Sequence, residues 1–389
     1  MIVYQHLPLT ALVLDNKICG NSASDRVWNI NLDQIEPNSG RVLNKIRVPP
    51  EELGPSTFPF SAGTILYSKL RPYLNKVIVA DEDGFATTEL VPLKCNPAKV
   101  LPSYLAHFLR SPGFLDFAKT VVSGAKMPRM VMSEFWKYRV PIPPLQEQRR
   151  VVTILDKTNT LRVKSQEFLR ELDRMAQSIF FEMFGDQHLH NISPESVKLA
   201  ELVNINPSIT LHERKSLLNS EVSFLPMASI CENDKNVIVN ELRPYDLVAK
   251  GYTSFKRGDL LVAKITPCYE NGKMAIASEL LTEYGFGSTE FHVFRTTDER
   301  LCLFVFYLLK QAWVMEAGAK SMKGAAGQKR VPADFFSSLR VINPQPQALE
   351  TFADRISKIE CMKKSVKQSL LELDALFFAL QHQAFSGAL

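Results

Sequence analysis

Two long stretches of the chain carry apolar residues in alternating steps of three and four, with no proline or glycine between their first and last turns. Such spacing is typical of a two-stranded coiled coil, whose apolar a and d positions repeat every seven residues. In residues 145–185 the predicted seam is Val151, Ile154, Leu161, Phe168, Leu172, Met175 and Ile179. In residues 345–387 it is Phe352, Ile356, Ile359, Val366, Leu370, Leu373, Phe377 and Leu380.

The length of both stretches favours pairing between them. A helix of about 40 residues is about 60 Å long, which exceeds the width of a small domain. We therefore expect the two helices to pair in an antiparallel coiled coil, because a parallel pair would crowd the globular parts at one end. Thr158, Ser165 and Lys363 interrupt the seam, and they either set its register or mark where a third partner packs. The alternative is an amphipathic helix packed on its own domain.

The segments that precede the two helices form a tandem repeat. GFATTELVPLK from Gly84 is similar to GFGSTEFHVFR from Gly285, and SGAKMPR from Ser123 is similar to KGAAGQKR from Lys323. The order is the same in both halves of the chain, and the offset stays close to two hundred residues. We therefore predict four parts: residues 1–144 (first globular domain), 145–185 (helix), 186–344 (second globular domain) and 345–387 (helix).

Each repeated domain is expected to be α+β. Short β-branched runs bounded by Gly, Pro and Asn predict strands at Lys76–Ala80, Leu90–Leu93, Leu260–Lys264 and Phe291–Phe294. One amphipathic helix follows in each domain, at Pro102–Leu109 and Leu301–Gln311. The predicted fold is two similar α+β domains, separated by the antiparallel coiled coil and related by a pseudo-twofold axis.

Composition and charge exclude some classes of protein. The 389 residues are 46% hydrophobic and 22% charged, with a formal net charge of +5. So small a positive excess allows a nucleic-acid partner without requiring one. The apolar run Leu301–Leu309 is too short to span a membrane, and the N-terminus lacks the basic segment of a signal peptide. We expect a cytoplasmic protein that does not contact membranes.

Catalytic and metal-binding motifs are missing. The sequence has no GxxxxGK[ST], no HExxH and no [DNS]PP[YFW] tetrapeptide of amino-methyltransferases. Asp259 and Lys264 lack the second carboxylate of a nuclease metal site, and the close pair His188 and His190 is assigned to a surface loop. No CxxC pair occurs, which argues against a disulfide framework and the common zinc sites; the cysteines are Cys19, Cys95, Cys231, Cys268, Cys302 and Cys361.

Basic residues cluster at matching places in the two domains, and we predict that they bind DNA. Arginine and glutamine have paired hydrogen-bonding groups that can read base edges, whereas lysines act as point charges for phosphates. The alternative, for any one of these residues, is a solvated surface side chain. The candidate DNA-binding residues are Lys69, Arg71, Lys76, Lys126 and Arg129 in the first domain, and Lys264, Asn271, Lys273, Lys323, Gln328, Lys329 and Arg330 in the second.

These segments resemble those of a known family, the specificity subunits of type I restriction–modification enzymes. PIPPLQEQRRVVTILD, from Pro141, is similar to the family's signature at the start of its central conserved helix. YSKLRPYLNKV, FKRGDLLVAKITPCYENGKMA and SGAKMPRMVMSEF resemble its target-recognition motifs. The start of the second helix, PQPQALE from Pro344, departs from the signature.

The resemblance implies a DNA-recognition subunit that is not itself an enzyme. Each domain would read one half of a bipartite, asymmetric site in double-stranded DNA, while the helices space the domains and dock two methyltransferase subunits. S-adenosylmethionine is expected on those partners and no cofactor on this chain, and two restriction/translocase subunits would complete the restricting complex. A coiled-coil scaffold that binds proteins, and a DNA-modifying enzyme with an unrecognised active site, are the two alternatives.

Overall fold

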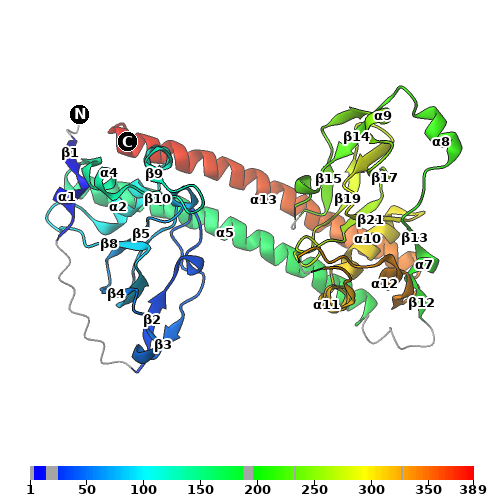
Figure 1. Cartoon of the computed structure of the whole chain (residues 1–389), viewed down its shortest axis with the longest axis horizontal. Helices are drawn as coiled ribbons and strands as arrows, with labels where there is room; N and C mark the ends of the chain where they lie inside the picture. Colours follow the sequence, from blue (N-terminus) through cyan, green and yellow to red (C-terminus); the bar gives the residue numbers. More distant parts are fainter. Residues whose placement is uncertain (1–3, 15–24, 187–195, 232–233, 326) are drawn as a thin grey trace. The chain divides into compact units, whose positions relative to one another are not determined.

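The computed structural model describes residues 4–14, 25–186, 196–231, 234–325 and 327–389 (Figure 1). It divides into two compact units: unit 1 comprises Met1–Phe168 and Ser365–Leu389, and unit 2 comprises Leu169–Lys364. Each unit thus contains one globular domain and part of each long helix. Cys19, His188 and His190 lie outside the described residues.

Unit 1 contains short strands and helices around two small sheets. Its strands are β1 (Gln5–Pro8), β2 (Val27–Ile30), β3 (Arg47–Val48), β4 (Thr57–Phe60), β5 (Ile65–Ser68), β6 (Val77–Val79), β7 (Gly84–Thr87), β8 (Leu90–Leu93), β9 (Val122–Ser123), β10 (Arg129–Met130) and β11 (Arg139–Ile142). Its helices are α1 (Leu9–Leu12), α2 (Pro102–Leu109), α3 (Pro112–Thr120) and α4 (Met132–Lys137), with 3-10 turns at Leu32–Gln34, Pro50–Glu52 and Pro72–Leu74. The two sheets have the orders β3-β2-β7-β4 and β6-β5-β8, and β1 pairs with β11.

The core of unit 1 lies between the β6-β5-β8 sheet and α2. Tyr104–Leu109 are all buried on α2, as expected for a helix that is apolar on most of its faces. The rings of Tyr67 and Phe135 lie 4.8 Å apart in this core. Each buried aromatic side chain contributes roughly 1.5–3 kcal/mol relative to exposure. The contact of Phe135 with Tyr67 packs α4 against β5 of this sheet.

Unit 2 repeats this plan with additional elements. Its strands are β12 (Val197–Lys198), β13 (Asn204–Ile205), β14 (Glu221–Leu225), β15 (Asn236–Ile238), β16 (Leu242–Pro244), β17 (Thr253–Lys256), β18 (Leu260–Ala263), β19 (Met274–Glu279), β20 (Tyr284–Gly287), β21 (Phe291–Arg295) and β22 (Arg340–Val341). Its helices are α7 (Leu199–Leu202), α8 (Leu211–Ser216), α9 (Tyr245–Val248), α10 (Glu299–Leu309), α11 (Ala312–Ser321) and α12 (Ala333–Ser338), with a 3-10 turn at Met227–Ser229. The sheets have the orders β13-β21-β18-β19-β15 and β16-β14-β20-β17.

The tandem repeat predicted from the sequence is confirmed in the strand topology. In unit 1, β2 runs parallel to β7, which pairs antiparallel with β4; in unit 2, β14 runs parallel to β20, which pairs antiparallel with β17. β5 lies between β6 and β8, as β18 lies between β19 and β21. Both domains are therefore α+β. The sequence predicts a single helix for each domain, which the structure has as α2 and α10. The helices α1, α3 and α4 in unit 1 and α7, α8, α9, α11 and α12 in unit 2 are additional.

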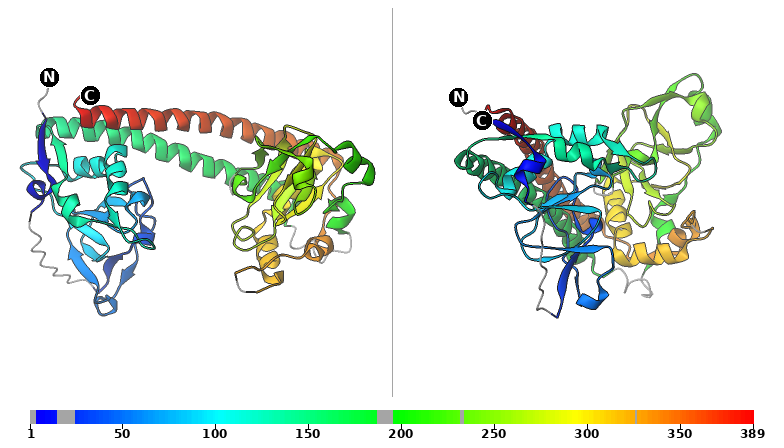
Figure 2. Two further views of the ribbon diagram at one scale, coloured as in Figure 1. Left: turned by 45° about the horizontal axis from the view of Figure 1, so that its top comes forward. Right: turned by 60° about the vertical axis from the view of Figure 1, so that its left-hand side comes forward.

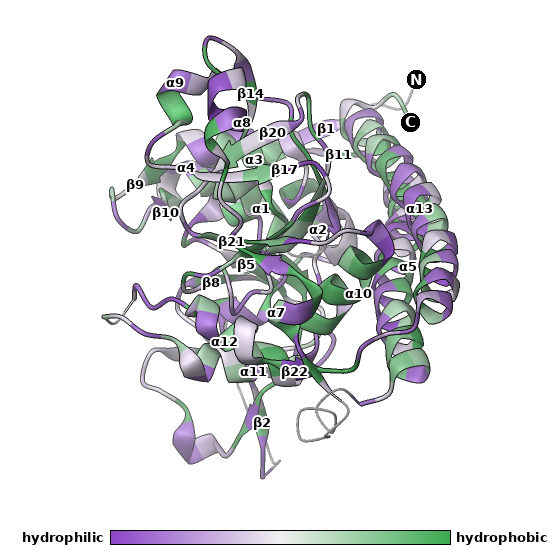
Figure 3. Cartoon of the chain, turned by 90° about the vertical axis from the view of Figure 1, so that its right-hand side faces the viewer, coloured by the Kyte–Doolittle hydropathy of each residue, from purple (hydrophilic) through white to green (hydrophobic). Residues whose placement is uncertain are grey.

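Helix α10 is the apolar centre of unit 2. Figure 3 shows it as almost wholly hydrophobic, and residues from Cys302 to Leu309 are buried. Among the described helices, none is by itself both long enough and apolar enough to cross a membrane. The pair α10 and α11 reaches that composition only jointly, and the two helices are bent by 71°.

The two long helices are α5 (Leu145–Phe184) and α13 (Pro346–Ser386). Within each unit they lie side by side in both views of Figure 2. In unit 1 Arg162 Nε lies 2.6 Å from Asp374 Oδ1, and Arg150 Nη1 donates to the Leu389 carbonyl at 3.5 Å. Since residue numbers rise along one helix as they fall along the other, the pair is antiparallel in unit 1.

Unit 2 shows the same direction of pairing. Lys363 Nζ lies 2.8 Å from Asp173 Oδ1, and Arg355 Nη1 lies 3.1 Å from Glu182 Oε1. Lys363 also contacts Glu360 at 3.4 Å, so the buried ammonium has two carboxylates. Arg162 and Lys363 occupy equivalent positions in the two repeats, and so do Asp374 and Asp173, because the same difference in residue number separates the members of each pair. The polar interruption at Lys363 is therefore an ion pair that fixes the register of the two helices.

The seam prediction is wrong at three positions of α5. Leu161, Phe168 and Met175 are 49%, 48% and 52% exposed. The error is one of phase: Ile154 and Leu155 are both apolar, and the structure buries Leu155 rather than Ile154. The seam steps by four residues from Val151 to Leu155, and it therefore contains Arg162 and Ala176 in place of Leu161 and Met175. The pattern of apolar residues alone cannot distinguish these two phases.

The remaining seam residues are at least partly buried. On α5, Val151 and Leu172 are buried, while Ile154 and Ile179 are half-buried. On α13, Phe352, Ile356, Ile359 and Phe377 are buried. The half-buried residues of α13 are Val366, Leu370, Leu373 and Leu380.

Gln148, in the PPLQEQ segment, attaches the start of α5 to unit 1. Its side chain is fully buried, and Oε1 accepts a hydrogen bond from the Leu101 N–H at 2.9 Å. Nε2 donates to the carbonyls of Lys99 and Pro143, each at 2.9 Å. The equivalent position in the second repeat is the buried Leu349, so an apolar contact replaces these bonds. This accounts for the departure of PQPQALE from the signature.

Candidate nucleic-acid interface

The basic segment 123–130 of unit 1 forms a hairpin. β9 and β10 pair antiparallel, with Arg129 opposite Ser123, so residues 124–128 make its tip. Gly124 has a φ of +92°, a backbone conformation that side-chain-bearing residues rarely adopt. Lys126 is exposed at the tip, and Met127 beside it is also exposed. The hairpin therefore presents one lysine and one large apolar side chain to solvent.

Backbone hydrogen bonds attach this hairpin to the segment after β5. The Met130 N–H donates to the Lys69 carbonyl at 2.8 Å, and the Arg71 N–H donates to the Pro128 carbonyl at 2.7 Å. Leu70 and Arg129 also form an isolated antiparallel bridge. The structure thus brings Lys69, Arg71 and the hairpin together, although the sequence separates them by more than fifty residues.

A salt bridge joins Arg129 to Glu89 in the TEL segment. Nε and Nη2 of Arg129 donate to the Glu89 carboxylate at 3.0–3.2 Å. The hydrogen bond from Arg129 holds the pKa of Glu89 below its usual value, and Glu89 in turn raises the pKa of Arg129. The backbone carbonyl of Glu89 also accepts from the Lys69 N–H at 3.0 Å. Arg129 is therefore held in place, and within the described chain its Nη1 makes no hydrogen bond.

Unit 2 contains the same arrangement at the matching residues. Arg330 donates from Nε and Nη2 to the two carboxylate oxygens of Glu290, both at 2.8 Å. The Val331 N–H donates to the Lys264 carbonyl at 2.9 Å, and the Lys264 N–H to the Glu290 carbonyl at 2.9 Å. Lys323 and Arg330 form an antiparallel bridge, as Ser123 and Arg129 do in unit 1.

The second hairpin differs from the first at its tip. Arg330 Nη1 also donates to the Gln328 carbonyl at 3.0 Å, so this guanidinium makes three bonds to its own domain. Gln328 and Lys329 are exposed, as is Lys323 at the start of the hairpin. The exposed amide of Gln328 lies at the place where the first hairpin has Met127 and Lys126. The two tips therefore offer different side chains on one scaffold.

The other candidate residues lie in less uniform surroundings. Lys76 Nζ donates to the Leu32 carbonyl at 2.6 Å, and burial lowers the pKa of Lys76. Lys264 is half-buried, and burial lowers its pKa as well. Asn271 is exposed in the turn after β18, and Lys273 follows it half-buried. The Lys76 ammonium is thus bound within its own domain, whereas the exposed side chain of Asn271 is accessible to a ligand.

Sequence reasoning missed the two glutamates. The segments TEL, at residues 88–90, and TEF, at residues 289–291, are recognisable as a repeat, but the sequence pattern does not connect their glutamates with the basic clusters. The signal that could have revealed the pairing is the common offset: Glu89 and Arg129 recur as Glu290 and Arg330, with the same change in number. A cation and an anion that recur together in a duplicated domain are candidates for a contact.

Comparisons with known proteins show which family this chain is similar to. Residues 55–167 match the family described as type I restriction modification DNA specificity domain. The specificity subunits of the type I restriction enzymes EcoEI and EcoAI from Escherichia coli are each 35% identical over 183 residues, which cover 46% of this chain and 30% of theirs. The chain thus spans less than a third of the length of these two curated relatives.

A solved structure extends the likeness to the whole fold. It was reported for complex assembly and conformational transition of the type I R-M system, and it covers 100% of this chain and 98% of its own, with a TM-score of 0.56. Identity to it is 14%, so this likeness concerns the fold alone. The resemblance that the sequence motifs indicate is confirmed: the chain carries a type I restriction modification DNA specificity domain and has the fold of a chain from that system.

Proposed function

We propose that this chain is the DNA-recognition subunit of a type I restriction–modification complex, and that each domain reads one half of a bipartite, asymmetric site. The observation that carries the proposal is the pair of basic hairpins, each held by an arginine–glutamate salt bridge at the same place in its domain. A rigid hairpin with an exposed basic tip suits a DNA groove, because fixed side chains lose little entropy on binding.

The two hairpins suit two different half-sites. In the first, Lys126 and the open Nη1 of Arg129 serve a phosphate or a base edge. In the second, the side chain of Gln328 has the paired donor and acceptor that fit adenine, while Arg330 positions the tip. The chain itself is proposed to be non-catalytic.

The helices are proposed to dock two methyltransferase subunits, which bring S-adenosylmethionine. Support comes from the outer face of α5: Leu161 and Phe168 are exposed in unit 1, and Met175 and Phe181 are exposed in unit 2. Large apolar side chains that remain exposed on a helix fit a helical partner better than solvent. Two restriction/translocase subunits are proposed to join the assembled complex.

A salt titration of DNA binding tests the hairpin assignment. The full chain, assembled with its methyltransferase partner, is measured on its cognate DNA and on random DNA. Lys126→Ala should weaken binding to both DNAs and lower the slope of log affinity against log salt by about 0.9. Gln328→Ala should weaken cognate binding alone. Lys94→Ala, on another exposed part of unit 1, serves as the control and should change neither. If all three variants behave alike, the hairpins do not contact DNA.

A further inference from the structure

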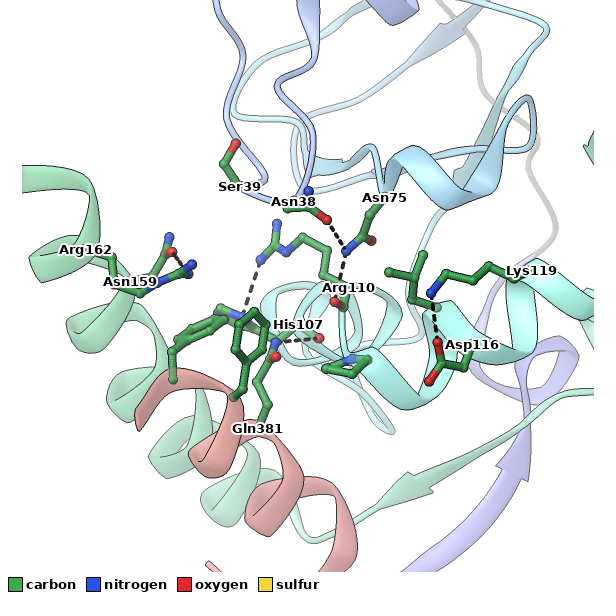
Figure 4. Close-up of a pocket in the computed structure, with 14 residues that line it drawn as sticks. Asn38, Ser39, Asn75, His107, Arg110, Asp116, Lys119, Asn159, Arg162 and Gln381 are labelled. Carbon is green, nitrogen blue, oxygen red and sulfur yellow. Dashed lines mark hydrogen bonds and ion pairs between the residues drawn. The ribbon is translucent and has the colours of Figure 1, made fainter. Parts of the chain in front are cut away.

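A cavity of about 220 Å³ lies in unit 1 beside the end of α2 and the two long helices (Figure 4). Asn38, Ser39 and Asn75 line it from the globular domain, and Asn159 and Arg162 line it from α5. Asp116 and Lys119 of α3, which pair with each other at 2.9 Å, also line it. Phe377, Phe378, Pro112 and Leu115 supply its apolar walls. None of the residues that line the cavity belongs to the DNA-binding hairpins.

Arg110 is the central charged group of this cavity. Figure 4 shows its side chain reaching from the end of α2 into the space between Asn38 and Arg162. Nη1 donates to the Val77 carbonyl at 3.2 Å, and Nη2 lies 3.4 Å from His107 Nδ1. Within the described chain no carboxylate lies at ion-pair distance from Arg110. Burial lowers the pKa of Arg110 to about 10, so the guanidinium is still charged at neutral pH.

The backbone around Arg110 is shaped to hold this guanidinium. Gly40 has a φ of +73°, and a Cβ at this position would overlap Arg110 Nη1. The Asn75 amide links two loops, since its Nδ2 donates to Asn38 Oδ1 and to the Arg110 carbonyl, each at 3.1 Å. The charged group therefore lies in a fixed place, and only glycine at position 40 leaves room for it.

His107 does not neutralise Arg110. His107 is buried, and burial lowers its pKa, although its hydrogen bond to Asp156 acts in the opposite direction. Its Nε2 lies 2.7 Å from Asp156 Oδ1, so the neutral ring donates from Nε2 and accepts from Arg110 at Nδ1. Asp156 is thereby engaged by the imidazole. The positive charge of Arg110 has no compensating anion at contact distance among the described residues.

Gln381 supplies a second, independent sign of a ligand. The residue is 1% exposed, lines the cavity, and its Oε1 has no hydrogen-bond partner. Nε2 donates to the His107 carbonyl at 3.4 Å, which assigns the other end of the amide as the oxygen. A buried acceptor without a partner is costly. The equivalent helix position in unit 2 is the buried Phe180, so the fold does not require a polar side chain there.

We propose that this cavity binds a small phosphate-class oxyanion that carries one protonated oxygen. Its charged oxygens would accept from Arg110, and its P–O–H group would donate to Gln381 Oε1. Inorganic phosphate and phosphate monoesters have such a group near neutral pH, because their second pKa lies near 6–7. Sulfate and the phosphodiesters of DNA have none. The inference is independent of DNA recognition, since the probe is a small anion and the residues differ.

Thermal unfolding of the full chain at constant ionic strength tests the site. Inorganic phosphate should raise the Tm along a saturating curve, as expected for a ligand that binds only the folded state. Sulfate should give only the gradual, unsaturated rise of an excluded salt. Arg110→Met should abolish the saturating part, Gln381→Leu should remove the preference for phosphate over sulfate, and Lys94→Met should keep the wild-type curve.

Glycerol phosphate, titrated in parallel, identifies the source of the phosphate group. If glycerol phosphate saturates at a lower concentration than inorganic phosphate, the ligand is a phosphate monoester. If it saturates at a higher concentration, the ligand is the free ion. Each result supports the site. Equal effects of phosphate and sulfate on the wild type, or a saturating curve in Arg110→Met, would overturn the proposal. If Arg110→Met does not fold, ³¹P NMR of phosphate with the wild-type chain replaces it, and the absence of binding-dependent line broadening is the contradicting result.

Discussion

Arg330 donates to both carboxylate oxygens of Glu290, each at 2.8 Å. The pair joins the hairpin of unit 2 to the turn before β21, which carries Glu290, and Arg129 with Glu89 does the same before β8 in unit 1. Both pairs are accessible to solvent, and exposed ion pairs of this kind add little to global stability. Their recurrence in two diverged domains is better explained by the position that they impose on the hairpin tip.

Glu290→Gln tests this positioning role. The substitution keeps the size of the side chain but removes the charge and one acceptor, so the hairpin loses one of its two bonds to Arg330. We expect discrimination in the second half-site to fall by about 10-fold, with little change in Tm. Binding competition against a panel of half-site variants measures this. Glu279→Gln, at an exposed position of β19, is the control, and equal behaviour of the two variants would contradict the role.

Leu155 and Leu161 provide a matched pair on α5. Leu155 is buried in unit 1, whereas Leu161 is exposed on the outer face. Leu155→Ala should lower the free energy of unfolding by about 2–5 kcal/mol, since it leaves a cavity. Leu161→Ala should change it by less than about 0.5 kcal/mol and weaken association with the methyltransferase subunit. Denaturant unfolding measures the stability of each variant, and co-purification measures its association with the methyltransferase subunit. If Leu161→Ala loses as much stability as Leu155→Ala, Leu161 lies in the seam, as the sequence pattern predicts.

The helices and the repeat could be predicted from the sequence because both are repeating patterns. A run of forty residues with apolar positions every three or four and no internal proline specifies a long helix. The duplicated segments specify two related α+β domains. The phase of the seam could not be predicted, because Ile154 and Leu155 satisfy the pattern equally and only the ion pairs of Arg162 and Lys363 decide it.

The contacts that build the candidate sites could not be predicted, because they join residues far apart in the chain. Glu89 meets Arg129 only after β5, β8 and the hairpin have come together. The Arg110 cavity needs residues from the loop at Asn38 and from α13 at Gln381, which no local pattern connects. The clusters of basic residues in the sequence therefore predicted which segments form the candidate interface, but not which of their side chains are free of contacts within the chain.

Gln148→Leu tests the attachment of α5 to unit 1. The change removes three hydrogen bonds and leaves the partly buried Leu101 N–H without its acceptor. We expect a loss of about 1–3 kcal/mol in the free energy of unfolding. Gln146→Leu, at an exposed position two residues earlier, should be nearly neutral by the same measurement. If the two variants lose equal stability, the hydrogen bonds of Gln148 do not anchor the helix.

His107 predicts a pH dependence of stability. Burial lowers its pKa below the ordinary value of 6.5, so at mildly acidic pH the unfolded chain binds a proton that the folded chain does not. Stability should therefore fall as the pH drops below 6.5 and continue to fall until the lowered pKa is reached. Between about pH 7.5 and pH 5.5 the Tm of the wild type should decrease more steeply than that of His107→Gln. Parallel slopes would show that His107 takes up its proton equally in both states.

The most direct test of modular DNA recognition is an exchange of the first domain. Residues 1–140 are replaced by the corresponding domain of another specificity subunit, and both proteins are expressed with their methyltransferase partner. Methylated sites are then mapped by sequencing. We predict that the wild type modifies one bipartite, asymmetric site, and that the chimera changes one half of that site and keeps the other. A change in both halves, or in neither, would contradict the account.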